Sequence, residues 1–418
     1  MLKIYKYILI ILLPIVKLNL NLRVKKGKEE KKRIKERFGL TKIKRPYGKL
    51  IWIHASSVGE FNSATGLINI LLKSHKILVT TSTVTASYYC KQIFNNKVIH
   101  QYAPLDHETW ILNFLKHWKP NLVIWIESDL WPNTIRTIKK NNIKQVLINL
   151  RISPKSFKKW KIIKKSFSQI LSNFDKIFVQ SKEDLNNIKK LTNVKINFVG
   201  NLKLTSLPQK INYDKLNKLK KITLSKKIIL IASSHKKEEY IILQNIKEIV
   251  KNNNVFIIIV PRHPNRALEL TKMVKKNFLE CSLESNRKIL DNTKCIIAKS
   301  LGEMSTYYKL SNIVILGGSF VEMGGHNPIE PARYKCAIIT GPSVYNWKNI
   351  FADMINKKAC ILCKSDKNLK KNVNYLLKNK SENMKIVNNA LKYTKKNQMI
   401  ISNIIENLKP FIKDNKNA

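Results

Sequence analysis

Arginine, acidic residues and long apolar runs are all scarce in this 418-residue chain. Only 10 of the 78 basic residues are arginines, and 27 acidic residues leave a net charge of +51. Proteins that read nucleic acids rely on arginine for bidentate contacts, so we expect no nucleic-acid partner. An anionic membrane surface, which attracts lysines beside an anchor, explains the charge better. A general drift of composition toward lysine is the alternative.

The six cysteines are scattered, and Cys360 and Cys363 form the CxxC spacing of the chain. No second pair or histidine cluster accompanies them, which argues against a zinc or redox site. Buried thiols in a reducing compartment are the better interpretation. We therefore predict no metal site.

The N-terminus carries an uncharged apolar run at residues 7–16, which is too short to cross a bilayer as a helix. Lys17 and Arg23 follow it, not the small residues of a cleavage site, so cleavage is not expected. Residues 23–49 then contain 13 basic and three acidic side chains. The pattern predicts a retained membrane anchor over residues 1–22, with the body of the protein on the cytoplasmic side.

Short apolar runs alternate with longer segments of helical spacing along the rest of the chain. This order predicts α/β architecture with parallel sheets, whose ligands bind beyond the carboxyl ends of the strands. A lysine-rich interval near residue 208 divides the pattern, so we expect two domains, residues 23–205 and 206–418. The strands are expected at residues 50–54, 76–81, 122–126, 145–149, 176–180, 195–199, 228–232, 255–261, 294–298, 312–316 and 337–340.

Residues 54–60, His-Ala-Ser-Ser-Val-Gly-Glu, complete the first expected strand and begin a helix. The dipole at a helix start favours the ionised form of Glu60. A carboxylate held there is suited to take a proton from an alcohol as a general base. A glutamate that only caps the helix is the alternative.

Another strand end carries Glu127 and Asp129 beside Trp131. Paired acids suit a metal ion, but no neighbouring histidine or third acid in the sequence supports one. We expect them to bind sugar hydroxyls or to form a local hydrogen-bond network.

In the second half, Ser233, Ser234 and His235 follow a strand and suit a phosphate or hydroxyl group. A Ser-His nucleophile is the weaker interpretation, because no glycines of a nucleophile elbow flank the serine. Arg262 follows Pro261 in a loop stiffened by two prolines, so its guanidinium is suited to hold a phosphate or nucleotide.

Residues 324–332, Gly-Gly-His-Asn-Pro-Ile-Glu-Pro-Ala, come after an apolar run and a glycine turn. Proline suits the first turn of a helix, so we expect a helix to begin near Pro328. Its free N–H groups would suit a phosphate, and Glu330 would accept hydrogen bonds from a ribose. An ordinary strand–turn–helix corner is the alternative. Residues 300–304 are expected to line a nucleoside pocket.

Taken in order, these segments resemble the Kdo (3-deoxy-D-manno-octulosonic acid) transferases of bacterial lipopolysaccharide synthesis. The resemblance covers nearly the whole chain, through HASSVGE, ESDLWPN, NLRIS, GNLKL, SSHKKEE, PRHPNR, LGEM, GGSF and GGHNPIEPA. It implies a GT-B fold, in which two Rossmann-like domains face each other across a cleft. The acceptor would bind the first domain and CMP-Kdo the second.

The resemblance also implies an enzyme at the bacterial inner membrane that moves Kdo from CMP-Kdo to the 6′-hydroxyl of lipid IV-A, a lipid A precursor. CMP leaves and the configuration inverts in one displacement, without a metal ion or other cofactor. By resemblance, Glu60 is the general base, and Asp129 and Lys203 stabilise the transition state. The family more often has glutamate where Asp129 stands, and the shorter side chain withdraws the charge by one methylene. Positions that resemble the CMP-binding segments are Pro261, Arg262, Leu301, Gly302, Glu303, Asn327, Pro328, Ile329 and Glu330.

Two other functions compete with this one. Another membrane-associated GT-B glycosyltransferase would use a different nucleotide-sugar, and UDP rather than CMP would protect it thermally. A non-enzymatic, basic membrane- or RNA-associated protein would bind polyanions in a salt-sensitive way, and that binding would survive the change Glu60→Gln.

Overall fold

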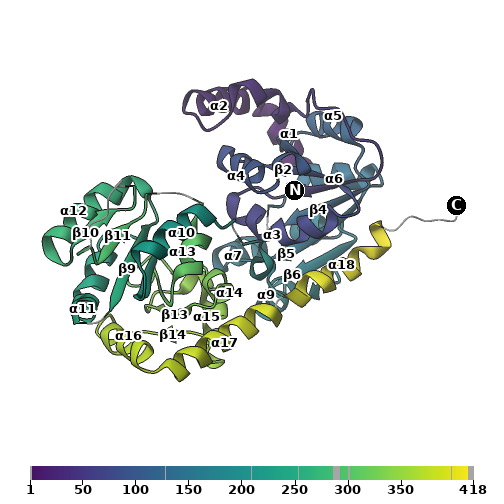
Figure 1. The fold of residues 1–418 in the computed structure, drawn as a ribbon. Helices are drawn as coiled ribbons and strands as arrows, with labels where there is room; N and C mark the ends of the chain where they lie inside the picture. The colour runs from purple at the N-terminus through teal and green to yellow at the C-terminus, as the bar shows by residue number, and fades with distance from the viewer. Residues whose placement is uncertain are drawn as a thin grey trace. The chain divides into compact units, whose positions relative to one another are not determined.

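The structure is a computed structural model that describes residues 2–412, except residues 128, 209, 253, 286–291, 300–301 and 397. The chain forms two compact units. The first unit comprises Met1–Leu207 and Asn397–Ala418, and the second comprises Pro208–Lys396. Both contain a parallel sheet with helices packed against it (Figure 1). The C-terminal helix, residues 398–412, therefore belongs to the first unit. The sequence pattern had assigned all of residues 206–418 to the second domain.

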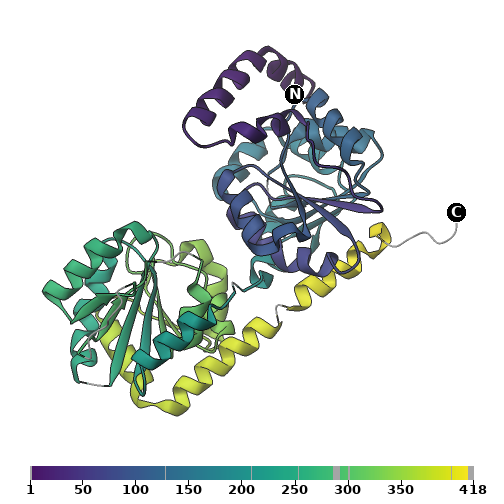
Figure 2. The same cartoon turned by 45° about the horizontal axis from the view of Figure 1, so that its top comes forward.

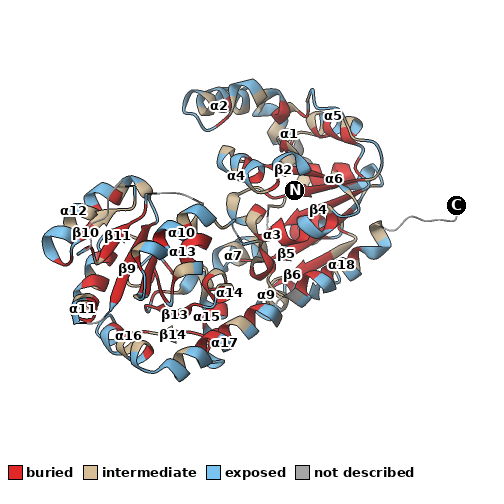
Figure 3. Cartoon of the chain, in the orientation of Figure 1, coloured by how far each residue is buried: buried red, intermediate tan, exposed pale blue. Residues whose placement is uncertain are grey.

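A seven-stranded parallel sheet is the centre of the first unit, in the order β3-β2-β1-β4-β5-β6-β7. Its strands are nearly continuous apolar runs, because helices cover both faces of such a sheet. Figure 3 shows most of these strands as buried, whereas both residues of the edge strand β7 are exposed. The sequence missed β3, in which His100 and Gln101 interrupt the apolar run. The strands are β1 (Leu50–His54), β2 (Lys76–Thr81), β3 (Ile99–Tyr102), β4 (Leu122–Ile126), β5 (Lys144–Leu150), β6 (Lys176–Val179) and β7 (Asn197–Phe198).

The helices of the first unit connect these strands, except for three segments at the N-terminus, one after β7 and one at the C-terminus. They are α1 (Leu2–Ile11), α2 (Leu13–Lys25), η1 (Lys31–Phe38), α3 (Val58–Leu71), α4 (Val84–Phe94), η2 (Asn95–Lys97), α5 (Glu108–Trp118), α6 (Pro132–Lys140), α7 (Pro154–Ile162), α8 (Lys164–Leu171), α9 (Lys182–Lys189), η3 (Leu202–Thr205) and α18 (Gln398–Ile412). Helices α1 and α2 are the darkest purple in Figure 2.

The second unit repeats this architecture, with strand order β10-β11-β9-β8-β12-β13-β14. Its strands are β8 (Lys227–Ser234), β9 (Val255–Pro261), β10 (Cys281–Leu283), β11 (Cys295–Ile297), β12 (Ile313–Leu316), β13 (Ala337–Thr340) and β14 (Ile361–Leu362). Its helices are α10 (Tyr213–Ile222), α11 (Glu238–Asn252), η4 (Pro264–Arg266), α12 (Ala267–Asn277), α13 (Met304–Leu310), α14 (Ile329–Arg333), η5 (Tyr345–Trp347), α15 (Lys348–Asn356), α16 (Asn368–Lys378) and α17 (Lys380–Lys396). The expected helix near Pro328 is α14, with Pro328 as its N-cap.

Close packing of α3 against η3 depends on Gly66. A Cβ atom at this position would lie 2.2 Å from the carbonyl oxygen of Thr205 and 2.8 Å from Cδ1 of Ile401 in α18. Only glycine permits this approach. The contact fixes η3, which carries Lys203, against the helix that carries Glu60.

The expected N-terminal anchor consists of two short helices rather than one. Helix α1 ends at Ile11, and α2 begins at Leu13 with a proline in its first turn. Among the described residues, no helix combines the length and the apolar character needed to cross a bilayer. Large apolar side chains of this segment are exposed, including Tyr7, Ile11 and Leu22.

Candidate active site

Three neighbouring strands of the first unit, β1, β4 and β5, end at one edge of the sheet. The strand order reverses between β1 and β4, and such a switch point is where α/β sheets bind ligands. The loops that leave these strands enclose a cavity of about 350 Å³. It is lined by Ser56, Ser57, Glu60, Glu127, Asp129, Leu130, Leu150, Arg151, Ile152, Ser153, Ser156, Trp160 and Phe167.

Glu60 lies in the first turn of α3 and takes part in a capping box with Ser57. The backbone N–H groups of Ser56 and Ser57 both donate to Oε2 of Glu60, at 2.6 and 3.2 Å. Among the described residues, none donates to its other oxygen, Oε1. The side chain therefore caps the helix and also faces the cavity, so the two interpretations of this residue are compatible.

The ionisation of Glu60 differs from the sequence-based expectation. Burial, followed by the nearby charges of Glu127 and Asp129, raises the pKa of Glu60 from 4.5 to about 7. His54 and a backbone hydrogen bond from Ser57 lower it by less. The helix start was expected to favour the charged form, but desolvation and two neighbouring carboxylates outweigh it. A pKa near neutrality suits a general base.

Asp129 is held by His54 at the end of β1. The Nε2 atom of His54 lies 3.2 Å from Oδ2 of Asp129, and its Nδ1 lies 2.9 Å from the hydroxyl of Thr80. Burial raises the pKa of Asp129, but hydrogen bonds from His54, Trp131 and Ser56 outweigh burial and bring the pKa below its ordinary value. Asp129 is thus a fixed carboxylate that stays ionised beside Glu60.

Lys203 is placed by a partner that the sequence did not reveal. Its Nζ atom lies 3.0 Å from Oε1 of Glu127, which follows β4 and is buried. Asn149, at the end of β5, accepts a hydrogen bond from the backbone N–H of Leu202 at 2.8 Å and so holds η3 in place. The one signal in the sequence was that Glu127 and Asn149 both stand at the ends of expected strands.

The predicted pairing of Glu127 and Asp129 therefore separates into two interactions. Glu127 binds Lys203, and Asp129 binds His54. Among the described residues, no group of three histidine, cysteine, aspartate or glutamate side chains has a metal-binding arrangement. Both acids belong to a local network, which was one of the two expectations.

In the second unit, one buried carboxylate holds two loops at the carboxyl edge of the sheet. Glu238, in the first turn of α11, is fully buried. It accepts hydrogen bonds from four backbone N–H groups: those of His235, Gly318, Ser319 and Phe320, at 2.7–3.1 Å. The first lies after β8 and the other three after β12, so Glu238 joins the loops at the switch point of this sheet.

Three segments that the sequence suggested for nucleotide binding meet beside these loops: those that contain His235, Arg262 and His326. The Nε2 atoms of His235 and His326 are 3.0 Å apart, and their rings are stacked. The backbone N–H of Arg262 donates to Ser234 at 2.9 Å. Burial, with the charge of Arg262 next, lowers the pKa of His326 to about 4, so this histidine is neutral at pH 7. Arg262 is an exposed cation beside these histidines.

Two family models together match most of the chain. The family model described as "3-Deoxy-D-manno-octulosonic-acid transferase (kdotransferase)" matches residues 32–206, and "Glycosyl transferases group 1" matches residues 212–393. A 3-deoxy-D-manno-octulosonic acid transferase of Rickettsia bellii is 34% identical over 90% of this chain and 91% of its own length. The chain belongs to the Kdo transferase family. A relative from Haemophilus influenzae with the same description is 30% identical over 98% of this chain and 99% of its own.

The fold of this Kdo transferase is also found among solved glycosyltransferases. The crystal structure of a glycosyltransferase from Rickettsia africae superposes with a TM-score of 0.58, covering 88% of this chain and 100% of the other. At 14% sequence identity the likeness concerns the fold alone. Together with the two parallel-sheet units, it supports the GT-B fold class.

The candidate nucleotide-binding residues at the end of β9 and the start of α14 are held by burial and local hydrogen bonds. Asn327 accepts a hydrogen bond from the N–H of Ile329 at 2.9 Å, which shapes the start of α14. Pro328 and Ile329 are buried, and Pro261 is the last, buried residue of β9. Burial raises the pKa of Glu330, and Arg333 and Asn327 lower it by less.

The segment around Gly302 is placed by different contacts. Gly302 has a positive φ of 79°, which leads into α13. Glu303 forms an ion pair with Lys215 and accepts a hydrogen bond from Asn212 at 2.9 Å. Its carboxylate is therefore bound by α10 and by the N-cap residue of that helix. Leu301 lies outside the described residues.

The pKa of Glu60 predicts how activity of the Kdo transferase depends on pH. A general base, the role expected for Glu60 from the sequence, must be deprotonated to act. The value of kcat/KM should therefore be constant above about pH 8. Below pH 7, where Glu60 gains its proton, it should decrease by close to tenfold per pH unit. Initial rates between pH 5 and 9 would measure this. Asp129, whose pKa is lowered, stays ionised throughout this range. An acid limb near pH 4.5 would contradict the raised pKa.

Proposed function

We propose that this transferase moves Kdo from CMP-Kdo to the 6′-hydroxyl of lipid IV-A, releasing CMP with inversion of configuration. The observation that carries the proposal is Glu60, a carboxylate with a pKa near 7 in a cavity at the switch point of the first sheet. With Oε2 held by two N–H groups, Oε1 takes the proton of the acceptor hydroxyl as that oxygen attacks C2 of Kdo. CMP leaves from the opposite side.

The charges around Glu60 have defined roles in this proposal. Lys203 stabilises negative charge that develops on the leaving phosphate or on the Kdo carboxylate. Glu127 fixes the position of its ammonium group at 3.0 Å. The negative charge of Asp129 raises the pKa of Glu60. Asp129 itself is held in place by its hydrogen bond with His54. All of these groups are supplied by side chains, and the proposal requires no metal ion or other cofactor.

The donor is proposed to bind at the carboxyl edge of the second sheet. Arg262 supplies positive charge for the phosphate of CMP, while the neutral His235 and His326 offer hydrogen-bonding ring nitrogens. Asn327, Pro328, Ile329 and Glu330 complete the nucleotide site around the start of α14. Pro261, Leu301, Gly302 and Glu303 are retained as candidates for CMP binding.

We also propose attachment to the cytoplasmic face of the bacterial inner membrane through α1, α2 and the basic segment that follows. Arginines and lysines of this segment have different roles in the structure. Arg23 and Arg37 bind Glu29, and Arg33 binds Glu36, so the arginines hold the segment together. The exposed cations are lysines, and six of them lie at positions 25, 26, 28, 31, 32 and 35. They face solvent beside the exposed apolar side chains of α1 and α2.

Replacing these six lysines by glutamine is expected to weaken binding to anionic vesicles and to remove most of its salt dependence. Each lysine near an anionic surface contributes about 1 kcal/mol, and salt screens that attraction. Co-sedimentation with vesicles at rising ionic strength would measure the effect. The matched control replaces six exposed lysines of the second unit, at positions 364, 367, 370, 371, 378 and 380. Equal losses in both variants would indicate an effect of net charge alone.

The reaction itself is tested by incubating the full chain with CMP-Kdo and tetraacylated lipid A precursor and measuring the mass of the product by mass spectrometry. A mass increase by one or more Kdo residues is expected, and the mass counts the sugars added. Thermal protection by CMP and UDP tests the donor separately. Protection by UDP alone would favour a glycosyltransferase with another nucleotide-sugar, and a folded protein that binds CMP without forming product would exclude this acceptor.

A further inference from the structure

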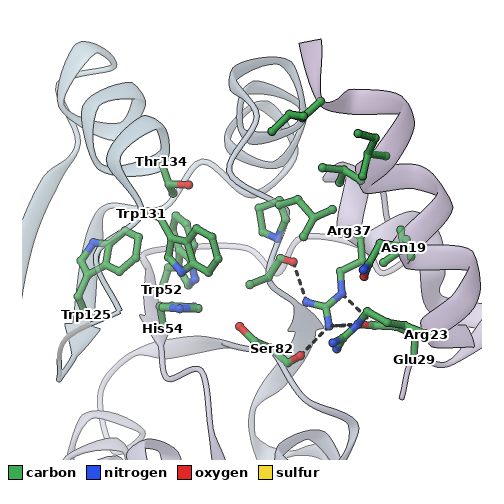
Figure 4. A pocket seen from close by; sticks show the side chains of 17 residues that line it. Asn19, Arg23, Glu29, Arg37, Trp52, His54, Ser82, Trp125, Trp131 and Thr134 are labelled. Carbon is green, nitrogen blue, oxygen red and sulfur yellow. Dashed lines mark hydrogen bonds and ion pairs between the residues drawn. The ribbon is translucent and has the colours of Figure 1, made fainter. Parts of the chain in front are cut away.

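A second cavity of the first unit lies between α2 and the carboxyl edge of the sheet, with a volume of about 420 Å³ (Figure 4). Figure 4 shows Trp52, Trp125 and Trp131 with His54 on one side, and α2 on the other. The other lining residues are Leu12, Ile15, Val16, Asn19, Leu20, Arg23, Glu29, Arg37, Ser82, Ala103, Pro104, Leu105 and Thr134. No role described above uses this cavity.

The charged side chains in the wall already have partners. Arg37 is buried and donates to Glu29 and to the carbonyl oxygens of Ser82 and Ala103. Arg23 also donates to Glu29. These guanidinium groups have little capacity left for a phosphate or carboxylate.

The polar atoms of the aromatic wall are paired as well. The indole N–H of Trp52 donates to Thr80, and that of Trp125 donates to Gln145. The hydroxyl of Thr134 donates to Asp106 at 2.6 Å. Apart from the side chains of Asn19 and Ser82, the groups that remain facing the cavity are aromatic rings and aliphatic carbons, so it is suited to an apolar ligand.

This cavity adjoins the catalytic one. His54 lines the apolar cavity and binds Asp129, which lines the catalytic cavity. Trp131 lines the apolar cavity and also hydrogen-bonds to Asp129. The rim is formed by α2 and its N-cap residue, Leu12. Leu12 and Ile15 are exposed beside the other exposed apolar residues of α1 and α2. A ligand here would reach from the apolar surface of the N-terminal helices to the side chains that hold Asp129.

We infer that this cavity binds one acyl chain of the glycolipid acceptor while a sugar hydroxyl of the same molecule lies at Glu60. The inference rests on the proposed function and adds a second contact to it. A molecule with a sugar and a hydrocarbon chain matches a polar cavity joined to an apolar one, whereas a free sugar would leave the aromatic wall exposed to water. The cavity volume lies in the range of pockets that enclose small ligands.

The change Ala103→Leu adds carbon atoms to the cavity wall and tests the inference. Two readouts are measured on the full chain. The first is quenching of tryptophan fluorescence by a dodecanoyl probe brominated along its chain, since three of the seven tryptophans line the cavity. The second is the ratio of kcat/KM for acylated and deacylated acceptor. Quenching should be lost and the ratio should fall about tenfold, the discrimination that one or two methylene groups give in an apolar pocket.

Two variants of α2 provide a check that does not depend on filling the cavity. Ile15 lines it and is 61% exposed, whereas Leu18 is 62% exposed and is absent from its wall. Both changes to asparagine remove the same apolar area from the helix surface. Ile15→Asn should weaken quenching and lower the ratio, and Leu18→Asn should keep the wild-type ratio.

The outcomes separate this inference from the proposed function. Quenching that survives both Ala103→Leu and Ile15→Asn would overturn the inference, whether or not Kdo is transferred. Quenching lost with an unchanged ratio would also overturn it, because the chain bound would then come from another lipid. If wild type bound the probe in the cavity but transferred no Kdo, the proposed reaction would fail instead.

Discussion

Replacement of Glu60 by glutamine is expected to lower kcat/KM for Kdo transfer by about 10²–10⁴-fold, the usual contribution of a general base. Glutamine has nearly the same shape and can still accept the N–H groups of Ser56 and Ser57 through its amide oxygen. It cannot take a proton from the acceptor hydroxyl. Transfer rates with saturating CMP-Kdo would measure the loss.

A measurement that does not depend on proton transfer shows whether the Glu60→Gln variant is correctly folded. Thermal protection by CMP reports on the donor site and should be the same in wild type and in Glu60→Gln. The activity that remains should also lose its acid limb near pH 7, because the titrating group is gone. Full activity in the variant would remove Glu60 from its proposed role and leave the family assignment intact.

Replacement of Glu238 by glutamine is expected to destabilise the second unit by about 3 kcal/mol, the cost of leaving buried donors without a charged acceptor. Oε1 accepts the N–H groups of Ser319 and Phe320, and Oε2 accepts those of His235 and Gly318. An amide offers one oxygen, so either pair would face an NH₂ group. Denaturant unfolding and CMP protection should both show the loss.

The control for this change lies on the same helix. Glu248 is exposed and pairs with exposed Lys370 at the surface of the second unit. Glu248→Gln makes the same chemical change and should leave the unfolding midpoint and CMP protection unchanged, because solvent screens such pairs. Equal effects of the two variants would show that Glu238 does not hold the loops together.

The sequence predicted much of both sheets because their strands are uninterrupted apolar runs. The strands β1, β2, β4, β9 and β13 have the expected bounds. The three missed strands lack that signal: β3 contains His100 and Gln101, β10 has three residues and β14 has two. Pairing with a neighbouring strand stabilises these segments, and a single sequence does not display that partner.

The site was predictable in position but not in its interactions. The ends of β1, β4 and β5 lie together because they are neighbouring parallel strands. The pKa of Glu60, however, depends on Glu127 and Asp129, which are more than 60 positions away in the sequence. The role of Glu238 depends likewise on backbone groups near residue 318. Distances of this kind are set by tertiary packing, and the local pattern does not contain them.

Helix α18 has a consequence for how the protein is made. Its buried Ile404 and Leu408, with Ile401 against Gly66, complete the first unit, yet they are encoded at the far end of the chain. The ribosome must add all of Pro208–Lys396 before it reaches them, which takes on the order of 10–40 seconds. The unit that carries Glu60 thus remains unfinished throughout synthesis of the other. A nascent or prematurely terminated chain contains Glu60, Asp129 and Lys203 without the helix that completes their unit.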